Sequence, residues 1–165
     1  MSYYSKLFIE DKISSIHPAK EQTMTKKIII WVVIAIVLLG VLIQLIPLPG
    51  RGNNPPVVAE PKWDSPQTAA LVKRACYDCH SNQTIWPWYS YVAPVSWLVY
   101  RDTMEGRSRL NFSEWNRPQR GAGEMIEAIQ SGRMPPAIYL PLHPSAQLTS
   151  AEKQQLITGL TNSLP

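Results

Sequence analysis

The chain has 165 residues, of which 17% are charged and fifteen are proline. A globular protein usually has more charge and less proline, so the composition excludes a disordered polyelectrolyte, a coiled coil and a long-stranded sheet. The net charge of +4 falls to +2 over residues 47–165, where eleven basic residues accompany nine acidic ones. This small excess of positive charge does not indicate a nucleic-acid-binding surface.

Residues 28–46 form an apolar run that only Gly40 and Gln44 interrupt. A helix of this length is about 28 Å long, close to the thickness of the hydrocarbon layer of a bilayer. We therefore predict a transmembrane anchor. A buried core helix and a cleavable signal peptide are the alternatives, but a signal has a shorter apolar region and a small-residue cleavage site, whereas this run leads into Pro47.

The charges that flank the apolar run indicate its orientation. Lys26 and Lys27 adjoin its start, whereas Arg51 is the only basic residue close to its other end. The positive-inside rule therefore predicts a single-pass protein of the bacterial inner membrane, with a cytoplasmic tail (1–27) and an extracytoplasmic C-terminal part. Because Met24 opens Met-Thr-Lys-Lys, residues 1–23 are alternatively a start-codon artefact.

Composition divides the part after the anchor into a tether and a domain. Residues 47–62 are rich in Pro, Gly and Asn, which predicts an extended tether that holds the domain off the membrane surface. Capping residues and apolar periodicity predict about four helices in residues 63–165, with no strand alternation, so the domain is read as all-α. The predicted helices run from Ser65 to the cysteine motif, from Pro94 to Gly106, from Gln119 to Ser131 with Gly132 as C-cap, and from Thr149 through Leu160.

Cys76 and Cys79 are the only cysteines of the chain, and they stand in the run Cys-Tyr-Asp-Cys-His. The pattern Cys-x-x-Cys-His is typical of c-type haem attachment. The two sulfurs form thioethers with the haem, and His80 then binds the iron as the proximal axial ligand. The motif predicts one covalently bound haem c.

The motif has two alternative interpretations. A thioredoxin-like dithiol requires a preceding strand, and none is predicted before Cys76. A structural zinc site could use Cys76, Cys79, His80 and His143, but zinc ligands usually come in separated pairs and the adjacent Cys79 and His80 would crowd one metal ion. Both alternatives are less favoured than haem.

The residues around the motif carry a family resemblance. The run from Cys76 to Trp97 reads CYDCHSNQTIWPWYSYVAPVSW, and the run from Leu110 to Trp115 reads LNFSEW. These runs resemble the membrane-anchored haem-binding domain family of bacterial single-haem cytochromes c, over about residues 64–160. The resemblance implies covalent haem c, a small cytochrome c-like α-helical fold and electron transfer, and it names no donor or acceptor.

Met134 is the favoured distal ligand of the iron. It is followed by Pro135 and Pro136, which stiffen the loop and remove backbone donors. A methionine before proline after a helix is similar to the axial methionine of many cytochromes c. His143 is the alternative and would give bis-histidine ligation. Met125 is read as core filler, and Met104 is a weak candidate.

The aromatic residues after the motif are predicted to form the haem pocket and its surrounding core, and they are Trp86, Trp88, Tyr89, Tyr91 and Trp97. An exposed ring that docks a partner is the other interpretation. Among the arginines of the domain, we expect at least one to pair with a haem propionate.

These observations predict a membrane-anchored cytochrome that carries single electrons between respiratory or photosynthetic components and is not an enzyme. Its expected partners are redox proteins, soluble or membrane-integral, and the membrane itself. A haem-based sensor or peroxidase-like protein with an open sixth site is one alternative, and a subunit of a larger electron-transfer complex is another.

Overall fold

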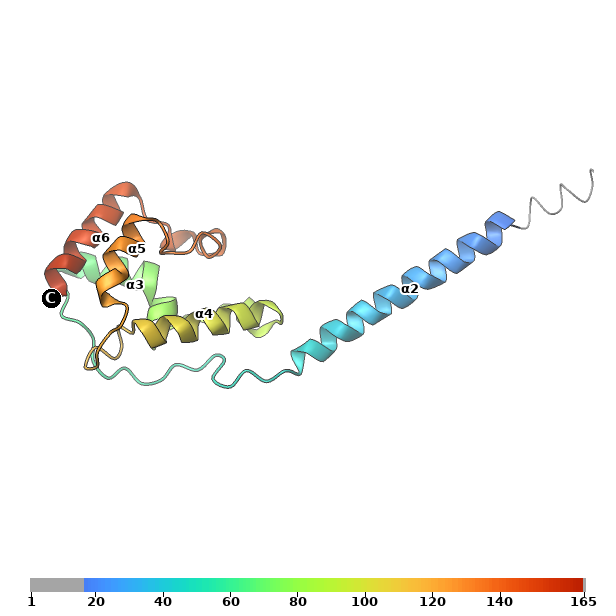
Figure 1. The fold of residues 1–165 in the computed structure, drawn as a ribbon, viewed down its shortest axis with the longest axis horizontal. Coiled ribbons are helices and arrows are strands. Elements are labelled where there is room, and N and C mark those ends of the chain that lie inside the picture. The colour runs from blue at the N-terminus through green and yellow to red at the C-terminus, as the bar shows by residue number, and fades with distance from the viewer. Residues whose placement is uncertain (1–16, 165) are drawn as a thin grey trace, which may run out of the picture. The chain divides into compact units, whose positions relative to one another are not determined.

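The computed structural model of the chain describes residues 17–164, and residues 17–22 by their backbone alone. Within that range the chain is all-helical, with five α-helices and no strand (Figure 1). The helices are α2 (His17–Gln44), α3 (Pro66–His80), α4 (Val95–Arg109), α5 (Met125–Gln130) and α6 (Ser150–Ser163), joined by the short 3₁₀ helices η1 (Trp88–Tyr91), η2 (Ala122–Glu124), η3 (Leu140–Leu142) and η4 (Pro144–Ala146). The predicted all-α class, with one N-terminal apolar helix before a domain of about four helices, is confirmed.

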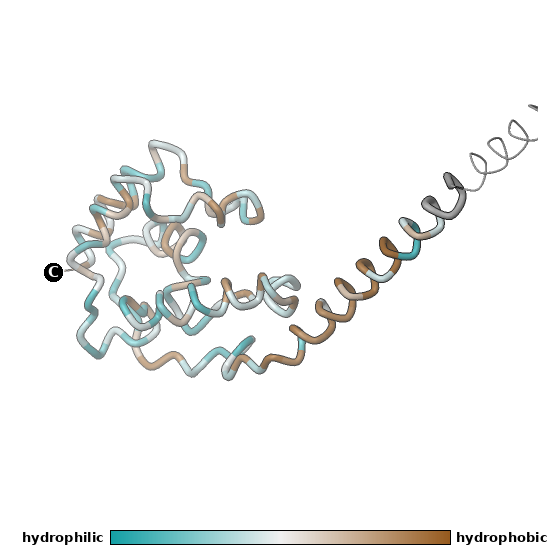
Figure 2. The backbone as a smooth tube through the Cα atoms, turned by 45° about the vertical axis from the view of Figure 1, so that its right-hand side comes forward, coloured by the Kyte–Doolittle hydropathy of each residue, from teal (hydrophilic) through white to brown (hydrophobic). Residues whose placement is uncertain are grey.

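Helix α2 contains the apolar run, and its hydrophobic stretch is visible in Figure 2. Residues Thr23–Gln44 are long and apolar enough to cross a membrane, and a signal sequence near the N-terminus would meet the same criterion. The helix ends at Gln44 rather than at Ile46, because the residue before Pro47 is disfavoured in helical conformation. Residues 1–16 of the predicted tail, and with them most of the suspected start-codon artefact, lie outside the described residues.

The compact unit after α2 begins at Leu48 and so includes nearly all of residues 47–62, the predicted extended tether. Part of this segment pairs with the rest of the domain. The Val58 and Ala59 amides donate to the Ser113 carbonyl at 2.8 and 3.1 Å, and the Trp115 amide donates to the Ala59 carbonyl at 2.9 Å. The proline-rich segment is extended as expected, but its unpaired backbone groups find partners in the loop after α4.

The core of the domain surrounds Phe112, which has no exposed surface. Its ring stacks between Tyr77 and Trp115 at centroid distances of 5.8 Å, and Trp63 meets it edge-on at 5.4 Å. Helix α3 packs against both α4 and α6, and α5 packs against α6. The buried cluster comprises Leu71, Val72, Tyr77, Leu110, Phe112, Ile129, Leu156 and Leu160.

The first and last helices of the domain begin where the sequence predicts. Ser65 Oγ accepts from the Thr68 amide at 3.2 Å, and Pro66 occupies the first turn of α3. Thr149 Oγ1 accepts from the Glu152 amide at 3.2 Å, while Glu152 Oε2 accepts from the Thr149 amide at 2.9 Å. This reciprocal pair is the predicted capping box of α6.

The helix predicted over Gln119–Ser131 is shorter in the structure, where α5 covers only Met125–Gln130 after the 3₁₀ turn η2. Gln119 explains the difference, because its side chain holds the preceding loop. Its Oε1 accepts from the Asn111 amide at 2.8 Å, and its Nε2 donates to the Glu114 and Arg117 carbonyls. Gly121 and Gly123 further weaken helical propensity before α5.

Gly106 lies inside α4, although the sequence predicted that it would end this helix. A Cβ atom at this position would overlap the carbonyl oxygen of Cys79 at the end of α3. The glycine is therefore required for the close approach of the two helix backbones.

We predict that Gly106→Ala lowers the free energy of unfolding by roughly 1–3 kcal/mol, the range of overpacking costs. The clash involves backbone, so it exceeds the gain in helix propensity. Denaturant unfolding of the detergent-solubilised chain, followed by circular dichroism, measures the change. Gly123→Ala is the matched control, because nothing lies within 4 Å of a Cβ at Gly123. Equal stability of the two variants would contradict the packing argument.

Candidate functional site

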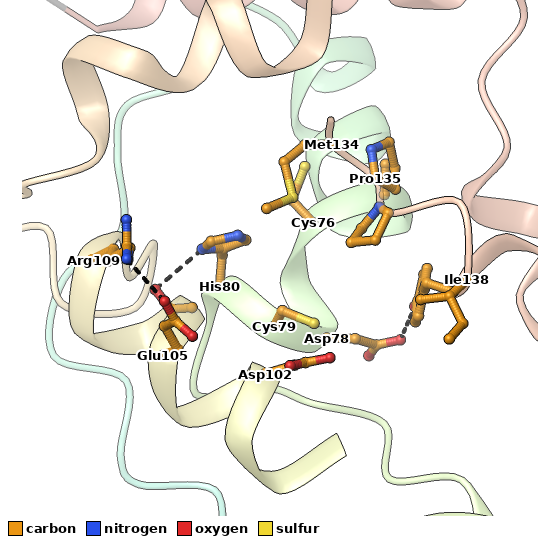
Figure 3. A pocket seen from close by; sticks show the side chains of 14 residues that line it. Cys76, Asp78, Cys79, His80, Asp102, Glu105, Arg109, Met134, Pro135 and Ile138 are labelled. Atoms are coloured by element: carbon orange, nitrogen blue, oxygen red, sulfur yellow. Dashed lines mark hydrogen bonds and ion pairs between the residues drawn. The ribbon is translucent and has the colours of Figure 1, made fainter. Parts of the chain in front are cut away.

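A cavity of about 380 Å³ opens between the end of α3, the second half of α4 and the loop that follows α5 (Figure 3). The cysteine motif and the segment after Met134 face each other across this space. The lining comprises Ala75, Cys76, Asp78, Cys79, His80, Asp102, Glu105, Gly106, Arg109, Met134, Pro135, Pro136, Ile138 and Tyr139. The volume lies within the range of small-molecule and cofactor sites.

Helix α3 brings the three residues of the motif to one face. Positions three and four apart are neighbours on a helix surface, so Cys76, Cys79 and His80 share the cavity side. Both cysteines are free thiols. Burial raises the pKa of Cys76 to about 12 and that of Cys79 to about 11. Both groups are therefore protonated thiols at neutral pH.

The hydrogen bonds of His80 fix its tautomer. Its Nδ1 lies 3.0 Å from the Leu110 carbonyl oxygen and 3.2 Å from that of Gly106. Carbonyl oxygens only accept, so Nδ1 carries the proton and Nε2 keeps a lone pair. Burial also lowers the pKa of the ring, which favours the neutral form. His80 is thus oriented as a metal ligand through Nε2.

Met134 reaches the same cavity from the other side (Figure 3). Gly132, with a φ of +73°, turns the chain away from α5 immediately after Ser131, the C-cap of this helix. The Met134 amide then donates to the Ala128 carbonyl at 3.0 Å, which fixes the backbone of the loop. The structure thus brings the predicted distal ligand and the predicted proximal ligand into one lining.

Asp78 and Tyr139 hold this loop against α3, and sequence reasoning assigned neither residue a role. The Tyr139 hydroxyl donates to Asp78 Oδ2 at 2.6 Å, and Asp78 Oδ1 accepts from the Ile85 amide at 2.9 Å. Asp78 lies between the two cysteines in sequence, which is the one signal that could have drawn attention to it. Nothing local relates it to a tyrosine 61 positions later.

A second cavity of about 260 Å³ adjoins the first, since five residues line both: Asp78, Cys79, Asp102, Ile138 and Tyr139. Its further lining includes Tyr89 and His143, together with Ile85, Val95 and Leu98. The two cavities follow the same cleft between α3, α4 and the loop after α5. A ligand larger than either cavity alone can therefore extend across Cys79.

His143 lies in the second cavity and not in the lining that His80 and Met134 share. Its ring stacks on Tyr139 with centroids 3.7 Å apart. Nδ1 donates to the Tyr139 carbonyl at 3.0 Å, so Nε2 is the atom that accepts from the Tyr89 hydroxyl at 3.0 Å. Both ring nitrogens are engaged within the protein.

The structure does not gather the ligands of the alternative zinc site. Among the described residues, no cluster of three or more His, Cys, Asp or Glu side chains is arranged to hold a metal ion. The described chain also has no strand before α3, which a thioredoxin-like dithiol would require.

Of the five aromatic residues predicted to wall the pocket, Tyr89 lines the second cavity, whereas Trp86, Trp88, Tyr91 and Trp97 line neither of the two cavities. The Trp86 indole packs under the Arg107 guanidinium at 5.8 Å and donates to Asn54 Oδ1 at 3.2 Å. Trp88 is 77% exposed, and Trp97 is half-buried on α4. The three indoles therefore serve the fold and the surface around the cleft.

Arg107 and Arg109 differ sharply in role. Arg107 is buried and donates to Ser81 O, to Asn54 Oδ1 and to Thr84 Oγ1, each at 2.8 Å. Its guanidinium is committed to protein acceptors. Arg109 lines the first cavity and pairs with Glu105 at 2.9 Å on an exposed surface, so it is the arginine placed to meet an anionic group of a bound ligand.

The remaining methionine candidates lie outside the first cavity's lining. Met125 packs partly buried against the core cluster, as predicted, and Met104 is half-buried within α4. Met134 is thus the methionine that shares a cavity with His80. Two thiols, an imidazole with a lone pair on Nε2 and a thioether form a donor set that fits an iron-containing haem.

Comparison with known proteins agrees with this geometry. The chain matches a family model described as a haem-binding domain over residues 38–162. No curated protein and no solved structure shows a significant match. The match covers more than half of the chain and includes the whole candidate site. The chain therefore belongs to the haem-binding domain family.

Proposed function

We propose that the protein is a membrane-anchored c-type cytochrome that carries single electrons through one covalently bound haem. The observation that supports this most directly is the shared cavity of Cys76, Cys79, His80 and Met134. Haem binding follows from family membership, and the type of attachment and the role are the proposal.

Each of these residues has a distinct part. The Cys76 and Cys79 thiols would hold the haem covalently, each through a thioether to one of its two vinyl groups. His80 would bind the iron through Nε2, while its Nδ1–H remains hydrogen-bonded to the Leu110 and Gly106 carbonyls. Met134 would offer its soft thioether to the same iron. When bound, the haem provides an iron that alternates between ferric and ferrous states.

Electron transfer rather than substrate turnover is favoured by the position of Met134. A protein ligand at the sixth site leaves no open position for a small molecule, which a sensor or a peroxidase needs. The partners in this proposal are redox proteins that exchange electrons with the haem domain. Acidic and basic residues are nearly balanced on this domain, which gives no support to a nucleic-acid partner.

The location in this proposal follows from helix α2. Lys26 and Lys27 lie at the cytoplasmic end of a single span, so the domain from Leu48 onward lies on the extracytoplasmic side. In this proposal the haem is attached on the extracytoplasmic side of the membrane, after the domain has been exported.

Replacing both thiols, Cys76→Ala with Cys79→Ala, should abolish covalent haem, because the chain contains no other cysteine. Haem staining after denaturing electrophoresis measures the attachment. Each single variant keeps one cysteine and can therefore still form one thioether. A haem-stained band of the double variant would refute the c-type assignment.

Met134→Ala should open the sixth site, because His143 is held by Tyr89 and by the Tyr139 carbonyl. We expect loss of the methionine-to-iron absorption band, a ferric spectrum that changes on adding cyanide, and a midpoint potential lower by on the order of 100 mV. His143→Ala is the matched control and should keep the band. Bis-histidine ligation would give the reverse result.

Tyr139→Phe should loosen the loop that carries Met134, since it removes the 2.6 Å hydrogen bond to Asp78. We expect a loss of about 1 kcal/mol in unfolding free energy and faster displacement of the distal ligand by cyanide. Stopped-flow absorbance follows the displacement. Tyr91→Phe removes a hydroxyl outside both cavities and should leave the rate unchanged; equal acceleration in both variants would argue against a positioning role for Tyr139.

A further inference from the structure

The segment that contains η1 exposes apolar side chains that the haem site does not use. Trp88 is 77% exposed, Tyr91 49% and Val92 44%, and none of them lines either cavity. In a 3₁₀ helix the side chains three positions apart are eclipsed, so Trp88 and Tyr91 lie on the same side of η1. Between them, Ser90 is buried and Tyr89 points to His143. We call Trp88, Tyr91 and Val92 the η1 surface.

The segment that contains η1 has no charged residue of its own. Residues 81–100 include no Asp, Glu, Lys or Arg, although the domain carries charged residues on both sides of this stretch. Exposed tryptophan and tyrosine are typical of the boundary between lipid and water, where an apolar ring with a polar edge is most stable.

The η1 surface lies next to residues 48–53, the first residues of the domain after α2. Only three residues separate Gln44, the end of α2, from Leu48, where the compact unit begins, so this connection spans at most about 14 Å. Residues 48–53 then form two tight turns, in which the Arg51 amide donates to Leu48 O and the Asn53 amide to Gly50 O, both at 3.0 Å. Residues 48–53 are therefore compact rather than extended.

The second of these turns contacts the η1 surface directly. The Arg51 guanidinium lies 5.9 Å from the centroid of the Tyr91 ring. A Cβ atom at Gly52 would lie 2.8 Å from the Tyr91 hydroxyl, so the glycine permits the contact. Its φ of +74° is also one that glycine tolerates best. Tyr91 is thus held against the part of the domain that is nearest in sequence to the anchor.

We propose that the η1 surface rests on the phospholipid bilayer in which α2 is anchored. This inference depends on the membrane insertion of α2 in the proposed function. The short connection keeps the turns at residues 48–53 close to the bilayer, and Trp88, Tyr91 and Val92 then enter its interface. The haem domain is thereby oriented on the membrane instead of tumbling on a flexible tether.

Site-specific photo-crosslinking tests the proposal in the full-length haem-loaded chain. Trp88 is replaced by p-benzoylphenylalanine, and the protein is reconstituted in nanodiscs of phosphatidylethanolamine and phosphatidylglycerol. Mass spectrometry then identifies lipid adducts. The same replacement of Trp31, on the apolar part of α2, reports insertion of the anchor, and replacement of the exposed Gln155 on α6 is the matched control. The haem absorption spectrum verifies folding of each variant.

Lipid adducts at positions 31 and 88 but not at 155 are the expected result. Adducts at 31 alone would overturn the bilayer contact while leaving the anchor intact. Absence of adducts at both 31 and 88 would overturn the anchor and this inference with it, which separates the two failures. Adducts at 155 equal to those at 88 would show undirected contact with lipid and would also overturn it.

A second variant gives an independent test. Trp88→Glu combined with Tyr91→Glu introduces charge into the η1 surface and should cause a loss of lipid adducts at a crosslinker in place of Val92, with those at position 31 retained. Gln155→Glu is the control and should leave both unchanged. In native membranes, a crosslinker at position 88 that captures a protein in place of lipid would assign this surface to a partner and refute the bilayer contact.

Discussion

The close approach of α3 and α4 at Gly106 is the constraint on which the site depends. With no side chain at this position, the α4 backbone reaches the Cys79 carbonyl. The same approach places the Gly106 and Leu110 carbonyls at hydrogen-bonding distance from His80 Nδ1. One contact between backbones therefore sets the distance between two helices, the tautomer of the imidazole and the direction of its remaining lone pair. A larger residue would disturb all three together.

The other side of the cleft is built by a loop with little regular structure. Its position is set at three points. The Met134 amide donates to the Ala128 carbonyl, the Tyr139 hydroxyl donates to Asp78, and the His143 ring stacks on the Tyr139 ring. The His143 ring stacks on Tyr139 and accepts a hydrogen bond from the Tyr89 hydroxyl. This histidine near the cleft therefore has a structural role. Asp78 connects this loop to the helix that carries both cysteines. The acidic residue within the motif thus links the two sides of the cofactor site.

Arg107 connects the start of the domain to the end of α3. It donates to the Ser81 carbonyl, to Thr84 and to Asn54, while Trp86 covers its guanidinium. A buried cation of this kind needs every donor to be satisfied, since an unpaired charge in the interior is costly. Asn53 and Asn54 are among its partners, so the segment after α2 is part of the folded domain. The aromatic-rich run after the motif contributes to this arrangement with Trp86 and to the surface with Trp88.

The sequence by itself determined the features that depend on neighbouring residues. The apolar run defines α2, Ser65 and the Thr149–Glu152 pair define the starts of α3 and α6, and the spacing of Cys76, Cys79 and His80 places them on one helical face. Each of these signals acts within a few positions, through hydrogen bonds and periodicity of the local backbone. They were therefore readable without a structure.

Only the tertiary structure decided which distant groups meet. The tether became part of the domain because Val58 and Ala59 pair with Ser113, and the helix before Met134 shortened because Gln119 bonds to the loop. The separation of Met134 from His143, which lie in different cavity linings, depends on Tyr89 and Tyr139. Such contacts join residues tens of positions apart, and their formation depends on how the whole core packs around Phe112. No local propensity encodes that packing.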